Sequence, residues 1–141
     1  MTSDPAAQAL VAEARQAMKN AHAPYSGFPV GAALLGNSGR VYRAANVENA
    51  SFGLSVCAER SAVFAAVAAG ERAFRALAVA TDTDQPTLPC GACRQVLREF
   101  VEDLPVYLAG RSGPYVTHSL HDLLPLAFAP DRENRAKPFG T

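Results

Sequence analysis

Long apolar runs are absent from this chain of 141 residues. The longest candidate, residues 61–70, is half as long as the roughly 20 residues that a helix needs to cross a bilayer. Residues 1–9 include Asp4 and Pro5 and lack the basic and apolar regions of a secretory signal peptide. We therefore expect a soluble, cytoplasmic protein with no membrane span.

An excess of charge is also absent. Thirteen Lys and Arg residues balance 13 Asp and Glu residues, and no basic run stands out. Proteins that bind a nucleic-acid backbone concentrate basic residues on one face. We therefore expect no nucleic-acid partner and no membrane partner.

Cysteine is scarce. An odd number of cysteines, three, fits poorly with the disulfide framework of a secreted protein and better with a metal site in a reducing compartment. A chain of this length buries about two-thirds of its unfolded surface without any disulfide, and 49% of its residues are apolar. With no repeat or linker in sight, we predict a single domain over residues 1–141.

The periodicity of apolar residues and the turn residues between them predict a layered α/β domain. Asp4 and Pro5 are typical of a helix start. We expect helices at residues 5–23, 57–69 and 91–100, and strands at residues 28–35, 41–47, 75–81, 106–109 and 115–117. The first two strands form a hairpin across a turn at residues 36–39. Residues 129–141 are predicted to be a loosely ordered tail.

The second of these helices is apolar almost all round at residues 62–68. A helix of this kind is expected to be covered by protein on both faces. Burial in a subunit interface and burial as a central helix of a monomer both satisfy this pattern.

All three cysteines fall into one pattern. Cys57 is followed two residues later by Glu59, and Cys90 and Cys93 have the spacing at which two thiolates reach one zinc ion. The sequence has no fourth cysteine, and its histidines lie elsewhere, at His22, His118 and His121. Three protein ligands leave one position open, which is typical of a catalytic zinc site.

The predicted helices favour the same interpretation, because each helix N-terminus stabilises a thiolate there. Three thiolates and Zn²⁺ sum to about −1, so bound water ionises less readily than at a histidine site. Such a site needs a base beside the metal, and Glu59 is placed for it. We expect Arg60 and Arg94 to offset part of the thiolate charge.

Two other interpretations of the cysteines stay open at this point. A lone pair with this spacing is also found in redox proteins, but that use leaves Cys57 unexplained. A structural zinc site requires a fourth ligand that the sequence does not supply. Glu59 alone is more typical of a solvated helix residue, although its neighbours on this helix are apolar.

Several segments together resemble the zinc nucleoside deaminases, and the small homotetrameric cytidine deaminases in particular. The resemblance runs from about residue 10 to Phe128. The segments are Ala23-Pro24-Tyr25-Ser26, residues 28–34, Asn46-Val47-Glu48-Asn49-Ala50-Ser51, Val56-Cys57-Ala58-Glu59-Arg60 and residues 89–97. Ala44 departs from the glycine of many relatives.

The resemblance implies a cytidine deaminase-like three-layer fold, with a mixed five-stranded sheet flanked by helices. It implies one zinc ion per chain, bound by Cys57, Cys90 and Cys93. It also implies that zinc hydroxide attacks C4 of cytidine or deoxycytidine, while Glu59 carries protons to N3 and to the departing ammonia. The resemblance also implies that Arg60 donates hydrogen bonds to the ligand sulfurs.

The resemblance further implies a substrate site. Asn46 and Glu48 hold the 3′-hydroxyl of the ribose, the Ala58 N–H contacts the base, and Phe28 packs on the base together with Phe128 of a neighbouring subunit. A homotetramer with shared active sites follows, with Tyr25 and residues 50–52 near the subunit boundary. Taken alone, Asn46 and Glu48 also suit a turn after a strand, and the two phenylalanines also suit a core.

Three rival functions remain on the sequence alone. One is deamination of blasticidin S or a free base, which shares the zinc motifs. Another is deamination of a base in single-stranded RNA or DNA, which the neutral charge disfavours. The last is a catalytically silent zinc-binding module, in which Glu59 has no task.

Overall fold

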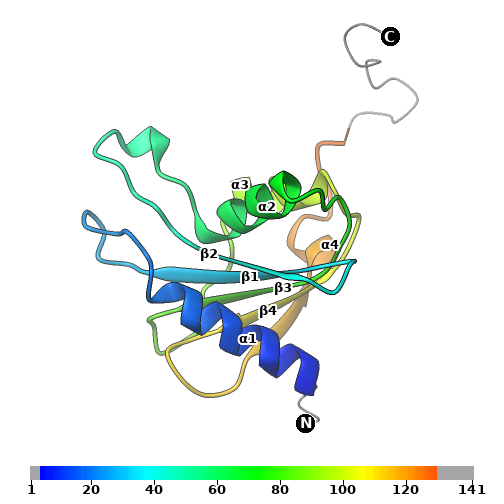
Figure 1. Cartoon of the computed structure of the whole chain (residues 1–141), viewed down its shortest axis with the longest axis horizontal. Coiled ribbons are helices and arrows are strands. Elements are labelled where there is room, and N and C mark those ends of the chain that lie inside the picture. Colours follow the sequence, from blue (N-terminus) through cyan, green and yellow to red (C-terminus); the bar gives the residue numbers. More distant parts are fainter. Residues whose placement is uncertain (1–3, 130–141) are drawn as a thin grey trace, which may run out of the picture.

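A computed structural model of the protein describes residues 4–129 (Figure 1). Its sheet has five strands in the order β2-β1-β3-β4-β5. They are β1 (Val30–Gly36), β2 (Val41–Ala45), β3 (Phe74–Thr81), β4 (Pro105–Ala109) and β5 (Val116–Ser119). β3 and β4 pair in parallel, and the other neighbours pair antiparallel. The predicted hairpin and mixed sheet are confirmed.

Helices cover both faces of this sheet (Figure 1). They are α1 (Pro5–Met18), α2 (Ala58–Ala68), α3 (Gly91–Arg98) and the short α4 (Leu120–Leu123), with a 3₁₀ turn at Phe52–Leu54. The strand period of two separates the faces. On β1, Ala33 packs with Leu10 and Ala14 of α1, whereas Leu34 packs with Val63 of α2. The predicted three-layer α/β fold is confirmed.

The first helix was predicted to end near residue 23, and this is wrong by about one turn. Asp4 caps α1 as expected, with Oδ1 accepting from Ala6 N at 2.9 Å, but the helix ends at Met18. His22 instead pairs with the segment after β2: its N–H donates to Asn46 O at 2.9 Å, and its carbonyl accepts from Glu48 N at 2.8 Å. This pairing over a long sequence separation ends the helix early.

The predicted ends of the first two strands also differ from those in the structure. Phe28 precedes β1, and Val47 lies beyond β2 in an isolated bridge to Val56. The sequence did not predict α4 or the 3₁₀ turn. The predicted tail lies outside the described residues except at Ala129. Among residues 4–129, none of the helices is long and apolar enough to cross a membrane.

α2 is covered on one side only by its own chain. Ala62, Val63 and Ala66 are fully buried, but Phe64 is 52% exposed and Ala65 and Ala68 are exposed. Within the described chain, the expectation that protein covers both faces is therefore not met, and an apolar strip on α2 faces outward.

Candidate active site

Two helix N-termini bring the three cysteines together. Cys57 is the N-cap of α2, Cys90 is the N-cap of α3, and Cys93 lies in the first turn of α3. The Sγ atoms of Cys57 and Cys90 are 3.8 Å apart, and those of Cys90 and Cys93 are 3.3 Å apart. All three sulfurs lie within 4.8 Å of one another.

This spacing fits a metal ion. A tetrahedral zinc with Zn–S bonds of about 2.3 Å places its sulfur ligands about 3.8 Å apart. The three cysteines are free thiols, and soft sulfur ligands suit zinc. Three ligands leave the fourth tetrahedral position for a water molecule or a substrate.

The site favours at least one thiolate even without a metal. A hydrogen bond from Cys93 and the Arg60 guanidinium lower the pKa of Cys57 to about 5, and Arg60 Nη2 lies 3.5 Å from Cys57 Sγ. The hydrogen bond to Cys57 and burial raise the pKa of Cys93. A cation that binds all three sulfurs therefore displaces protons.

Arg94 donates hydrogen bonds to backbone carbonyls near the site. Its Nε donates to Pro89 O at 2.9 Å and its Nη1 to Leu123 O at 2.7 Å. The expectation that Arg94 offsets part of the thiolate charge stays a prediction. The side chain ties the segment before Cys90 to α4.

Glu59 lies beside the sulfurs in a cavity of ≈ 400 Å³. The residue is 4% exposed, and burial raises the pKa of its carboxyl group. The cavity is lined by Ser26, Phe28, Val30, Asn46, Glu48, Cys57, Glu59, Val79, Thr81, Thr87, Leu88 and Cys90. Its volume is that of a site for a small molecule.

Three predicted substrate residues, Phe28, Asn46 and Glu48, line this cavity. Glu48 Oε1 accepts from Tyr25 N at 3.0 Å and from Ser26 N at 3.1 Å, and Oε2 accepts from Ser26 Oγ. These bonds, that of the Ser26 hydroxyl first, lower the pKa of Glu48. Glu48 is thus held as an ionised acceptor at the cavity wall.

The last two predicted substrate residues are placed differently. Ala58 is fully buried as the first residue of α2, where helix N–H groups lack partners within the helix. Phe128 is 77% exposed and is not among the residues that line the cavity. Its carbonyl accepts from Gln95 Nε2 of α3 at 2.8 Å.

Six residues that line the cavity were not predicted as site residues: Ser26, Val30, Val79, Thr81, Thr87 and Leu88. Val79 and Thr81 belong to β3 and read as ordinary strand residues in the sequence. Thr87 and Leu88 belong to a loop without periodicity. Ser26 belongs to the segment Ala23-Pro24-Tyr25-Ser26 that resembles the family. Its hydrogen bond to Glu48 joins residues 22 positions apart, so the sequence alone does not report it.

A small-molecule cavity with an open cluster of three thiols and a buried carboxylate defines a class of site. In this class a metal ion with a free coordination position acts together with an adjacent acid or base. In this α/β fold, the N-terminal ends of α2 and α3 supply the three thiols, and α2 also supplies the carboxylate.

Comparison with known proteins identifies the family to which this site belongs. Residues 5–108 match the family model described as the cytidine and deoxycytidylate deaminase zinc-binding region. Cytidine deaminase of Sporosarcina psychrophila is 49% identical over 121 residues, which are 85% of this chain and 89% of the relative. Cytidine deaminase of Halalkalibacterium halodurans is 49% identical over 128 residues, 90% and 97% of the two chains.

Solved structures of cytidine deaminases have the same fold as this chain. The crystal structure of cytidine deaminase from Burkholderia pseudomallei superposes with a TM-score of 0.83 at 50% identity, covering 91% of this chain and all of that chain. That from Mycobacterium tuberculosis gives 0.78 at 41% identity, covering 89% and 99%. The chain belongs to the cytidine and deoxycytidylate deaminase family. Zinc is therefore its metal, and the cysteine cluster has room for one ion.

Proposed function

We propose that this chain is a zinc-dependent cytidine deaminase that hydrolyses cytidine and deoxycytidine to uridine and deoxyuridine with release of ammonia. One observation carries the proposal: two cysteines of the three-thiol cluster, Cys57 and Cys90, line one small-molecule cavity together with the buried Glu59, Asn46 and Glu48. The relatives that bear the name cytidine deaminase and match most of this chain support the substrate.

In this proposal Cys57, Cys90 and Cys93 bind the metal, and Arg60 stabilises the Cys57 thiolate. When bound, zinc supplies an activated water molecule as the nucleophile. The sulfur spacing and the Arg60 contact support these assignments.

Glu59 is the proposed proton carrier. It is the second residue of α2, and its near-complete burial leaves its carboxyl group little contact with bulk water. The reaction needs a group that takes a proton from water and gives it to N3 of the base, then takes the remaining proton of that water from the oxygen bonded to C4 and gives it to the departing amine. A carboxylate within reach of all three atoms can perform each transfer.

The proposed nucleoside site uses Phe28 against the base, the Ala58 N–H toward the base, and Asn46 with Glu48 for the 3′-hydroxyl. Glu48 is an ionised acceptor, and Asn46 Nδ2 keeps one of its two N–H groups beyond the bond to Phe28 O. A site that binds the 3′-hydroxyl and makes no contact at the 2′ position accepts both cytidine and deoxycytidine.

We also propose a homotetramer in which Phe128 enters the cavity of a neighbouring subunit. The exposed strip on α2 supports an interface, as do the exposed side chains of Phe52 and Leu126. The exposed Phe128 is free to reach another chain. Three free thiols at a metal site also favour the reducing cytoplasm as the location.

The test is ammonia release from the zinc-loaded protein with cytidine as substrate. Glu59→Gln keeps the shape of the side chain and removes its proton transfer, so kcat should fall by about 10²–10⁴-fold with zinc retained. Glu13→Gln on the far helix α1 is the matched control and should leave kcat unchanged. A folded, zinc-loaded protein that releases no ammonia from cytidine or deoxycytidine would refute the proposal.

A further inference from the structure

The loop at residues 82–89 forms part of the cavity wall. It connects the end of β3 to Cys90, and its residues Thr87 and Leu88 line the cavity. Hydroxyl contacts to the buried Thr81 hold its inner side: Thr81 Oγ1 lies 2.7 Å from Thr83 Oγ1 and 3.4 Å from Thr87 Oγ1. Since the loop has no regular secondary structure, its position depends on such contacts with its neighbours.

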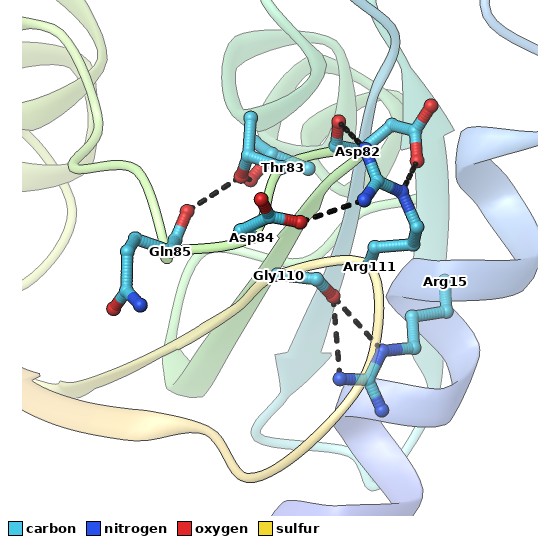
Figure 2. Close-up of polar contacts among 8 residues, drawn as sticks. Arg15, Asp82, Thr83, Asp84, Gln85, Gly110 and Arg111 are labelled. Atoms are coloured by element: carbon cyan, nitrogen blue, oxygen red, sulfur yellow. Dashed lines mark hydrogen bonds and ion pairs between the residues drawn. The ribbon is translucent and has the colours of Figure 1, made fainter.

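Arg111, from the loop between β4 and β5, holds the outer side (Figure 2). Its side chain donates to Asp82 Oδ1 at 2.7 Å, to Asp84 Oδ1 at 2.8 Å and to Asp82 O at 3.1 Å. Its backbone N–H donates to Thr83 O at 2.7 Å. One planar guanidinium thus binds several acceptors of one loop in a fixed geometry.

The loop that carries Arg111 is itself fixed to α1. Arg15 donates through Nε and Nη2 to Gly110 O at 3.3 Å (Figure 2). Its Nη2 also donates to Gly113 O at 2.9 Å. Gly110 permits the close approach of the two loops, because a Cβ atom there would lie 2.5 Å from Thr83 O. Contacts therefore run without a break from α1 to the cavity wall.

We propose that Arg111 is a positioning residue for nucleoside binding: by holding residues 82–84, it keeps Thr87 and Leu88 in place at the cavity wall. This inference rests on the proposed deaminase function. Arg111 does not itself line the cavity. Its ion pairs are exposed, and exposed pairs contribute little to the free energy of unfolding. The effect therefore belongs to substrate binding and not to overall stability.

The test compares Arg111→Ala with Arg75→Ala. Arg75 lies at the opposite end of β3 and is also an exposed fork, with Nε 3.2 Å from Asn37 Oδ1 and Nη2 2.6 Å from Asn37 O. With zinc-loaded protein, Arg111→Ala should raise KM for cytidine about threefold to tenfold and change kcat less than about twofold. Arg75→Ala should change neither. Arg111→Lys keeps the positive charge but not the planar guanidinium, and its KM for cytidine should lie between that of the wild type and that of Arg111→Ala.

Hydrogen exchange gives a second readout that does not depend on the substrate. Residues 82–89 should exchange faster in Arg111→Ala than in the wild type or in Arg75→Ala, with zinc content and thermal midpoint unchanged. An Arg111→Ala protein with the KM and the exchange of Arg75→Ala would overturn the inference. If the wild type releases no ammonia from cytidine, the proposed function fails, and the exchange comparison alone decides whether Arg111 holds the loop.

Discussion

Asn46 stabilises the entry into β1 as well as lining the cavity. Its Nδ2 donates to Phe28 O at 2.9 Å, and its Oδ1 accepts from Val30 N at 2.8 Å. The side chain thus pairs backbone groups on both sides of Pro29 that β1 cannot pair itself. Because Phe28 and Val30 also line the cavity, one amide sets the position of the wall and offers a donor to a ligand.

We predict that Asn46→Ala lowers the free energy of unfolding by about 1–3 kcal/mol, because it leaves two partly buried backbone groups without a partner. It should also raise KM. Asn49→Ala is the control: Asn49 is exposed, and its Oδ1 accepts only a local bond from Ser51 N at 2.8 Å. Denaturant unfolding measures both variants, and equal losses would contradict the structural role of Asn46.

Residues that carry the chemistry were predictable because ligand spacing is a local signal. Cys57 with Glu59, and Cys90 with Cys93, each lie within one helical turn, so the sequence itself reports their proximity. Thr87 gives no such signal, because its place at the cavity depends on contacts of its loop with β3 and with Arg111. The substrate roles came from the resemblance and stay predictions.

At the scale of elements, the close packing of α1 on β1 depends on the small size of Gly31. A Cβ atom at this position would lie 2.0 Å from Ala14 O and 2.5 Å from Met18 N. The last turn of α1 could accommodate it only by moving away from the sheet. Alanines opposite α1, such as Ala33 and Ala78, complete this closely packed layer.

We predict that Gly31→Ala destabilises the protein by about 1–3 kcal/mol through overpacking. Gly53→Ala is the matched control, because nothing lies within 4 Å of a Cβ atom there and its φ is not in the left-handed region. Thermal and denaturant unfolding compare the two. Similar stability of the two variants would show that α1 can shift without loss.

The end of α1 is an element boundary that the sequence alone did not predict. Apolar residues continue at helical spacing past Met18, so the pattern extends the helix toward residue 23. Pairing of His22 with Asn46 and Glu48 ends it instead. Local propensity does not report this pairing, because the partners are more than 20 residues apart.

At the scale of the whole molecule, the proposed tetramer would bury apolar side chains that the single chain leaves exposed. Phe52 is 73% exposed, Leu126 is 93% exposed, and Phe64 stands out from the face of α2. Large exposed apolar surfaces mark interaction sites in soluble proteins.

We predict that Phe64→Glu dissociates the tetramer, because it places a charge in the interface proposed for α2. Activity should fall with it, since each cavity would lose the Phe128 of its neighbour. Val41→Glu on the edge strand β2 is the control, as Val41 is also exposed, at 40%. Light scattering after size exclusion measures the mass. A wild-type monomer, or a tetramer that survives Phe64→Glu, would contradict the assembly.

The two helix N-termini that meet at the sulfurs also make the metal a cross-link. Cys57 and Cys90 are 33 positions apart, and the chain between them includes α2 and the central strand β3. By the loop-entropy relation, closing a loop of this length restricts the unfolded chain by about 4 kcal/mol. Zinc would then act on folding as a reversible, acid-labile equivalent of a disulfide.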